Sequence, residues 1–120
     1  MPRLELVTHN GKEIAIIDLS NSMPQEAIAF LAACQKELAR RPPKSVLALT
    51  DATNAIFDKE SARAMMEFVA KNTPLIKASA VLGADSLRLV LLNTITAETG
   101  RDIKAFQTRE EALDWLAGRG

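Results

Sequence analysis

The sequence predicts an α/β domain with a mixed five-stranded sheet, whose first strand is antiparallel and whose other strands are parallel, and with four helices. Two patterns predict this fold class. Asn10-Gly11 lies between two β-type segments near the N-terminus, and the later apolar β-type segments alternate with helix-type segments. Such alternation favours parallel strands covered by helices. The length of 120 residues predicts a single domain over 1–120.

The first two strands are expected to form a hairpin over residues 3–9 and 12–19. Asn-Gly is the strongest short hairpin signal, because both central residues of the turn need positive φ. A two-residue turn pairs Val7 with Ile14. The first strand is partly polar and is predicted at the edge of the sheet, whereas the second is apolar on both faces and is predicted to be buried.

The helix boundaries are predicted from caps and prolines. Ser22 and Gln25 have the spacing of a capping box, and Pro42 stops the first helix near Arg40. Asp58 is predicted to cap the second helix. The remaining elements are strand 46–49, polar loop 50–57, a helix that ends before Pro74, strand 80–82, helix 85–100, strand 103–106 and a helix opened by a capping box at Thr108.

Apolar residues at helical spacing predict the buried helix faces. Helix 85–100 is apolar nearly all round, so either it is packed between the sheet and a neighbouring element or part of it is exposed; we favour partial exposure and a homodimer or docking surface. The predicted inward faces are Ala27, Ile28, Leu31, Cys34 and Leu38 in the first helix, Ala62, Met65, Met66 and Val69 in the second, and Ala112, Leu113, Trp115 and Leu116 in the last.

Charge and hydropathy disfavour several classes of partner. Fifteen basic and fifteen acidic side chains cancel, so we expect no nucleic-acid partner and no attraction to anionic lipid. No segment approaches 18 consecutive apolar residues, and the N-terminus lacks the apolar stretch of a signal peptide. We therefore expect a cytoplasmic protein without a membrane partner.

Three stretches carry a family resemblance: residues 46–51, where a strand ends in aspartate, residues 80–83, where a strand ends in glycine, and the tail from Ile103 to Leu116. In this order they resemble the STAS domain, the fold of bacterial anti-sigma-factor antagonists, and in particular its SpoIIAA-like branch, which is grouped with STAS and CRAL-TRIO folds. The likeness covers nearly the whole chain. It implies a non-enzymatic regulatory or adaptor domain that acts by protein contact.

The phosphorylation switch of those antagonists does not carry over. Their acceptor serine follows an aspartate at the start of the second helix, where a phosphate is tolerated. Here Asp58 matches the aspartate, but Lys59 takes the place of the serine. Ser61 would substitute only after a shift of register. We therefore expect no phosphoregulation of this kind.

Polar residues gather where the parallel strands end, the edge at which sites form in open α/β sheets. Asp18 and Asp51 are expected to be neighbours, either as an acid/base or magnesium pair or as turn and capping residues, and we favour the second interpretation. The candidate binding residues at this edge and at the start of the second helix are Asp18, Ser20, Thr50, Asp51, Thr53, Asn54, Asp58, Lys59, Ser61 and Asp85.

The sequence predicts no catalytic residue, metal or cofactor. His9 is the only histidine and lies at the hairpin tip, Cys34 lies in an apolar helix face, and no phosphate-binding glycine motif is present. An alternative function is binding of a small apolar or nucleotide-like ligand at the carboxyl ends of the strands. A phosphoacceptor receiver domain ranks last, because Asp18 lacks an acidic neighbour and Gln107 follows the last strand instead of lysine.

Overall fold

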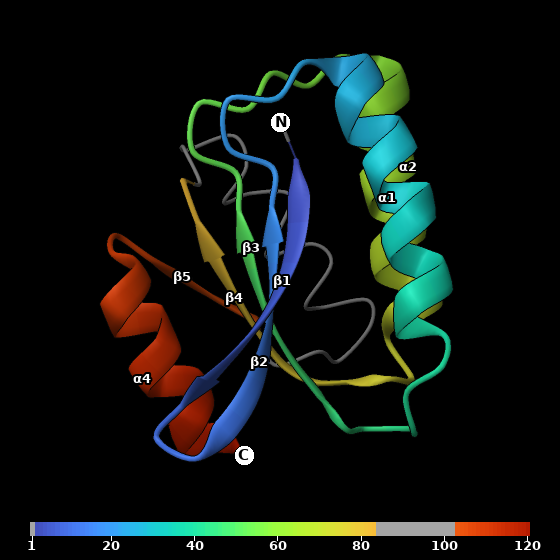
Figure 1. Ribbon diagram of the computed structural model, residues 1–120. Coiled ribbons are helices and arrows are strands. Elements are labelled where there is room, and N and C mark those ends of the chain that lie inside the picture. Colours follow the sequence, from blue (N-terminus) through green and yellow to red (C-terminus); the bar gives the residue numbers. More distant parts are fainter. Residues whose placement is uncertain (1, 84–102) are drawn as a thin grey trace.

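The computed structural model describes residues 2–83 and 103–120, which form one five-stranded sheet in the order β1-β2-β3-β4-β5. Helices α1 and α2 lie side by side on one face of the sheet, and α4 lies on the other (Figure 1). The elements are β1 (Arg3–His9), β2 (Lys12–Asp18), α1 (Pro24–Leu38), β3 (Val46–Asp51), α2 (Lys59–Asn72), β4 (Ile76–Leu82), β5 (Ile103–Phe106) and α4 (Arg109–Arg119).

The predicted hairpin and the mixed sheet are confirmed. Asn10 and Gly11 have φ angles of 51° and 79°, as a two-residue hairpin turn requires. Val7 pairs with Ile14 in an antiparallel β1–β2 ladder without a bulge. The three other pairings, β2–β3, β3–β4 and β4–β5, are parallel.

Strands β3 and β4 are longer than predicted. Thr50 and Asp51 were expected in a polar loop, but both are buried and pair with Ile17 and Asp18 of β2. Strand β4 begins at Ile76, earlier than predicted. Its exposed Lys77 lies between two buried residues, which is the ordinary alternation of a strand. Polarity alone therefore gave the wrong strand ends.

The predicted capping box of the first helix is wrong by one residue. Helix α1 is capped at Met23, whose backbone N–H donates to Glu26 Oε1 at 2.9 Å. Ser22 is buried instead, and its hydroxyl donates to the carbonyl of Leu19. The helix ends at Leu38, close to the predicted end.

Among the described residues, an apolar core lies on each face of the sheet. The α1–α2 core holds Leu31, Cys34 and Ala48, and the α4 core holds Leu49 and Leu116. Full burial of each leucine contributes roughly 1.5–3 kcal/mol relative to exposure.

The predicted inward face is nearly correct for α1 and α4 and is rotated for α2. In α2 the buried residues are Ser61, Phe68, Val69 and Asn72, whereas Ala62 and Met66 are half-buried. A buried asparagine and a buried serine hid the true face from a search for apolar spacing. The Nδ2 of Asn72 donates to Gln35 Oε1 of α1 at 2.7 Å, so a polar contact joins the two helices.

The helix expected over residues 85–100, with its proposed dimer surface, lies outside the described residues. The described part of the chain contains three helices, α1, α2 and α4. None of these three is long and apolar enough to cross a membrane.

Candidate functional site

Two four-residue segments with the same pattern end the neighbouring strands β2 and β3. They read Asp-Leu-Ser-Asn over residues 18–21 and Asp-Ala-Thr-Asn over residues 51–54. The parallel register places Asp18 beside Asp51, as the sequence predicted. We call these segments the β2 turn and the β3 turn.

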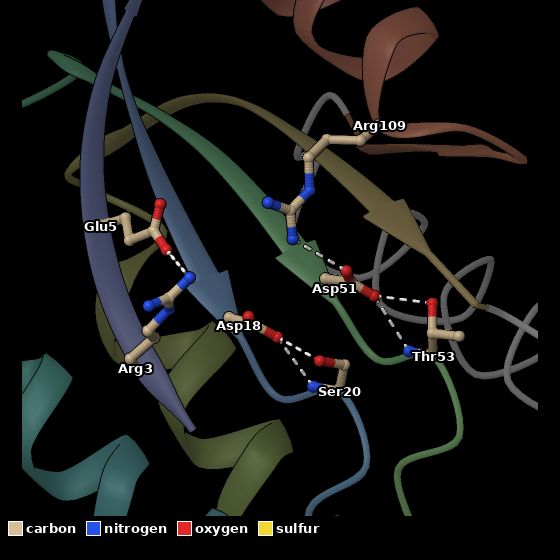
Figure 2. Close-up of polar contacts among 7 residues, drawn as sticks. All are labelled: Arg3, Glu5, Asp18, Ser20, Asp51, Thr53 and Arg109. Carbon is tan, nitrogen blue, oxygen red and sulfur yellow. Dashed lines mark hydrogen bonds and ion pairs between the residues drawn. The ribbon is translucent and has the colours of Figure 1, made fainter. Parts of the chain in front are cut away.

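Each aspartate is bonded to the third residue of its own turn (Figure 2). Asp18 Oδ1 accepts from the backbone N–H of Ser20 at 3.0 Å and from its hydroxyl at 2.6 Å. Asp51 Oδ1 accepts from the same two groups of Thr53 at 3.1 and 2.7 Å. Of the two interpretations of the pair, this geometry supports the one in which the aspartates satisfy turn backbone.

Asparagine closes each turn in the same conformation. Asn21 and Asn54 both have a φ of 58°, a left-handed value that asparagine tolerates better than most residues. Backbone bonds from Ser22 N–H to Leu19 at 3.2 Å and from Ala55 N–H to Ala52 at 3.1 Å complete the turns. These bonds close the four-residue β-turns 19–22 and 52–55, and positive φ at the third residue of a β-turn is the pattern of a type II turn.

Backbone hydrogen bonds also join the two turns to each other. The Leu19 N–H donates to the Asp51 carbonyl at 2.8 Å, and the Asn21 N–H donates to the Thr53 carbonyl at 2.9 Å. Gly83, with a φ of +76°, packs against the β3 turn so closely that a Cβ there would lie 2.5 Å from Thr53 N. The edge is therefore a preformed backbone platform.

A long-range ion pair distinguishes the β3 turn. Arg109, the first residue of α4, donates to Asp51 Oδ2 at 3.0 Å (Figure 2). Burial alone raises the pKa of Asp51, but the hydrogen bonds from Thr53 and the Arg109 guanidinium outweigh it and hold the pKa below its usual value. The sequence analysis did not identify Arg109, because no local pattern links it to a residue 58 positions away.

The start of α2 is a closed capping box. Asp58 Oδ1 accepts from the Ser61 N–H at 2.8 Å, and Ser61 Oγ accepts from the Asp58 N–H at 2.9 Å. Hydrogen bonding to the Asp58 carboxyl by the backbone N–H of Ser61, and next by its side chain, lowers the pKa of that carboxyl. Ser61 has no exposed surface, whereas Lys59 is exposed. The predicted cap at Asp58 is confirmed.

The segments that follow the two turns each carry an exposed apolar side chain. Met23 is 52% exposed and Ile56 is 54% exposed. The Ile56 N–H donates to the carbonyl of Ser22 at 3.0 Å, which places the Ile56 backbone beside the residue that precedes Met23, the N-cap of α1. We call Met23 and Ile56 the apolar pair.

The described structure therefore brings most of the predicted site residues to one edge. Thr50 is an exception, because it is buried within β3, and Asp85 lies outside the described residues. Met23 and Ile56 were missed. The repeated Asp-x-Ser/Thr-Asn pattern is the sequence signal that marks the paired turns, and it was also overlooked.

The histidine and the cysteine lie apart from this edge. His9 Nε2 is 2.6 Å from Asp114 Oδ1 at the far end of β1. Cys34 is buried in the α1–α2 core, as predicted. Burial, and to a smaller extent the nearby charge of Glu37, raises the pKa of its thiol to about 12. In residues 2–83 and 103–120 no three His, Cys, Asp or Glu side chains are grouped as metal ligands.

A groove of about 200 Å³ lies at the opposite end of β2 and β3. Its lining comes from β1, the start of β2, the end of α1 and the start of β3, and includes Leu4, Leu6, Ala15, Leu38 and Val46. The groove therefore does not adjoin the paired turns.

Comparison with solved structures identifies the class of fold. An uncharacterized protein of the DUF3478 family with a SpoIIAA-like fold, from Shewanella loihica PV-4, aligns with a TM-score of 0.77 at 17% identity, covering 96% of this chain and 93% of that one. An anti-sigma-factor antagonist (STAS) domain protein from Planctomyces limnophilus aligns with a TM-score of 0.63 at 10% identity, covering 95% and 97%.

The chain therefore has a STAS-like fold of the SpoIIAA type, as the sequence resemblance predicted. No protein-family model matches the sequence, and no curated protein matches it.

Proposed function

We propose that this chain is a cytoplasmic regulatory or adaptor domain that acts by binding another protein and catalyses no reaction itself. The observation that carries the proposal is the apolar pair, Met23 and Ile56, exposed beside the two interlocked turns. The solved STAS domain of an anti-sigma-factor antagonist supports a protein partner by analogy of fold.

The composition of this surface fits a protein contact. Each of the two large apolar side chains lies within three positions in sequence of exposed polar residues of the turns and of the α2 start, among them Asn21, Thr53 and Lys59. A small apolar centre with a polar rim is the usual anatomy of a binding hot spot. Because the turns are fixed by their own backbone bonds, little conformational entropy is lost when a partner docks.

The partner is proposed to bind without phosphoregulation of the antagonist type. Lys59 occupies the exposed first position of α2, where it cannot accept a phosphate as serine does. Ser61 is fully buried, and its hydroxyl accepts from the Asp58 N–H and donates to the Asp58 carbonyl. A kinase would therefore have to unfold the start of the helix to reach it. Thr53 is exposed, so phosphopeptide mapping should include it, and stoichiometric phosphate on Thr53 would contradict this part of the proposal.

The state of the nucleophile and base candidates supports a non-enzymatic role. The Cys34 thiol is buried and stays protonated at neutral pH, because its pKa is raised to about 12. The carboxylates of Asp18 and Asp51 are engaged by their own turns, and His9 contacts Asp114 away from that edge.

The direct test is native mass spectrometry of the protein purified gently from its own host. We expect an added mass that corresponds to a second, different polypeptide. Once that protein is identified, Met23→Ser/Ile56→Ser should weaken its binding at least tenfold, whereas Leu6→Ser, at an exposed leucine of β1, should not.

A bound molecule of a few hundred daltons would instead support the alternative function, binding of a small apolar or nucleotide-like ligand. The 200 Å³ groove lies at the opposite end of β2 and β3, so it is not the ligand site that this alternative requires.

A further inference from the structure

Strand β1 is an edge strand of the sheet that the described residues form. Its inner side pairs with β2 along all seven residues, and no strand in the described ranges pairs with its outer side. Natural edge strands are commonly protected by a proline, a bulge or charged side chains, above all lysine. Arg3–His9 contains no proline, bulge or lysine, and its charged residues Arg3 and Glu5 form an ion pair with each other. Instead Leu6, at the middle of the strand, is 51% exposed.

The hairpin geometry determines which backbone groups face outward. In a two-residue hairpin the flanking residues, here His9 and Lys12, form a hydrogen-bonded pair, and such pairs alternate along the ladder. The backbone groups that bond to β2 are therefore those of Arg3, Glu5, Val7 and His9. The outward N–H and C=O groups are those of Leu4, Leu6 and Thr8.

We propose that β1 pairs antiparallel with β1 of a second copy of this chain, about a twofold axis at Leu6. In this register Leu6 lies opposite Leu6, and Leu4 lies opposite Thr8, so every outward backbone group just named meets a partner. The ten-stranded sheet that results is continuous across the two copies. A symmetric strand pair of this kind is a self-complementary interface.

Neighbouring registers are less favourable. A twofold axis at Glu5 would oppose two glutamate side chains directly, a destabilising cross-strand pair. An axis at Leu4 would place Pro2, which has no N–H, opposite Leu6. With the axis at Leu6, Glu5 lies opposite Val7 instead.

The side chains fit the same register. Leu4 and Leu6 point to the α1 side, where they line the groove with Ala15 and Val46, so pairing extends that apolar strip into the second copy. On the other face Arg3, which pairs with Glu5 of its own strand, comes opposite His9, which is hydrogen-bonded to Asp114. The register thus places one charged or polar pair of each copy opposite a polar pair of the other.

Cysteine cross-linking of the full chain tests both the pairing and the register. Opposed residues of a hydrogen-bonded pair have Cα atoms about 5.5 Å apart, within disulfide reach. Leu6→Cys should therefore form a disulfide-linked dimer on oxidation with copper phenanthroline, while native Cys34 stays buried and unlinked. Leu4→Cys alone and Thr8→Cys alone should link much less, and the double variant should link efficiently.

Sedimentation velocity completes the test. The wild-type chain should be a dimer at micromolar concentration, and Leu6→Lys should raise the dissociation constant at least tenfold, because two lysines would face each other. Met23→Ser/Ile56→Ser should leave the dimer intact, so failure of the dimer and failure of the partner surface are distinguishable. A monomeric wild type up to 100 μM, or equal cross-linking by Glu5→Cys, would overturn the proposal.

Discussion

The β2 turn and the β3 turn have nearly the same sequence but different surroundings. Both use an aspartate to hold the backbone and hydroxyl of the third residue, and both place an asparagine at a φ of 58°. Only the β3 turn also contacts Gly83 and receives Arg109 on its aspartate. The β2 turn lies nearer the edge of the sheet and has neither contact among the described residues.

This difference separates what a tetrapeptide determines from what the fold adds. The turn conformation is a local property, because short polar side chains bond to their own backbone two residues on. The energetic weight of a turn depends on groups that are distant in sequence. The β3 turn should therefore be the more sensitive of the two to substitution.

The largest effect is expected at Gly83. Gly83→Ala places a Cβ 2.5 Å from Thr53 N at a φ of +76°, so it combines a backbone clash with left-handed strain and should lower the free energy of unfolding by roughly 2–4 kcal/mol. Gly11→Ala is the matched control, because it has a φ of +79° with nothing within 4 Å and should cost only about 1–2 kcal/mol. Urea unfolding measures both. Equal losses would mean that the β3 turn yields to the added methyl group.

The aspartates give the next effect. Asp51→Ala removes the turn bonds and the Arg109 pair, whereas Asp18→Ala removes turn bonds alone. We expect Asp51→Ala to cost about 1 kcal/mol more, a modest figure because Arg109 is partly exposed to solvent. Arg109→Gln should account for most of that difference. If the two aspartate variants unfold at the same urea concentration, the ion pair contributes nothing.

Acid should reveal the same asymmetry. The pKa of Asp51 is lowered in the folded state, so its carboxylate stabilises the fold above the unfolded pKa, and this contribution is lost as the pH falls through the folded pKa. The stability difference between the wild type and Asp51→Asn should therefore shrink below about pH 4. Urea titrations at a series of pH values measure it. A difference that grew on acidification would contradict the lowered pKa.

The smallest effect is expected at Lys59, the first residue of α2. A cation in the first turn of a helix is mildly unfavourable, by roughly 0.3–1 kcal/mol. Lys59→Ser should therefore be neutral or slightly stabilising in thermal melting. A fall of many degrees would show that Lys59 has a structural partner.

The sequence patterns predicted what depends on neighbouring residues. The Asn10-Gly11 hairpin, the caps at Asp58 and Thr108 and the adjacency of Asp18 and Asp51 were all predicted, because turn chemistry and strand order determine them. These local signals also explain why the five-stranded mixed sheet could be predicted.

Features that depend on distant residues could not be predicted in this way. Arg109 reaches Asp51 only after β5 and α4 have packed, and Thr50 joins β3 because both neighbouring strands cover it. Met23 and Ile56 are apolar, as core residues are, so the sequence alone does not show that the tertiary structure leaves them exposed. Buried Ser61 and Asn72 misled the apolar pattern of α2 for the converse reason.

The measurement that tests the central claim most directly is site-specific photo-cross-linking in the host cell. A photoreactive phenylalanine analogue at position 56 lies in the apolar pair, and the same analogue at position 71 lies on an exposed residue at the opposite end of α2. We predict one defined heterologous protein adduct from position 56 and none from position 71, with the adduct lost in Met23→Ser. The same adduct from both positions, or from neither, would contradict a role of this edge in protein binding.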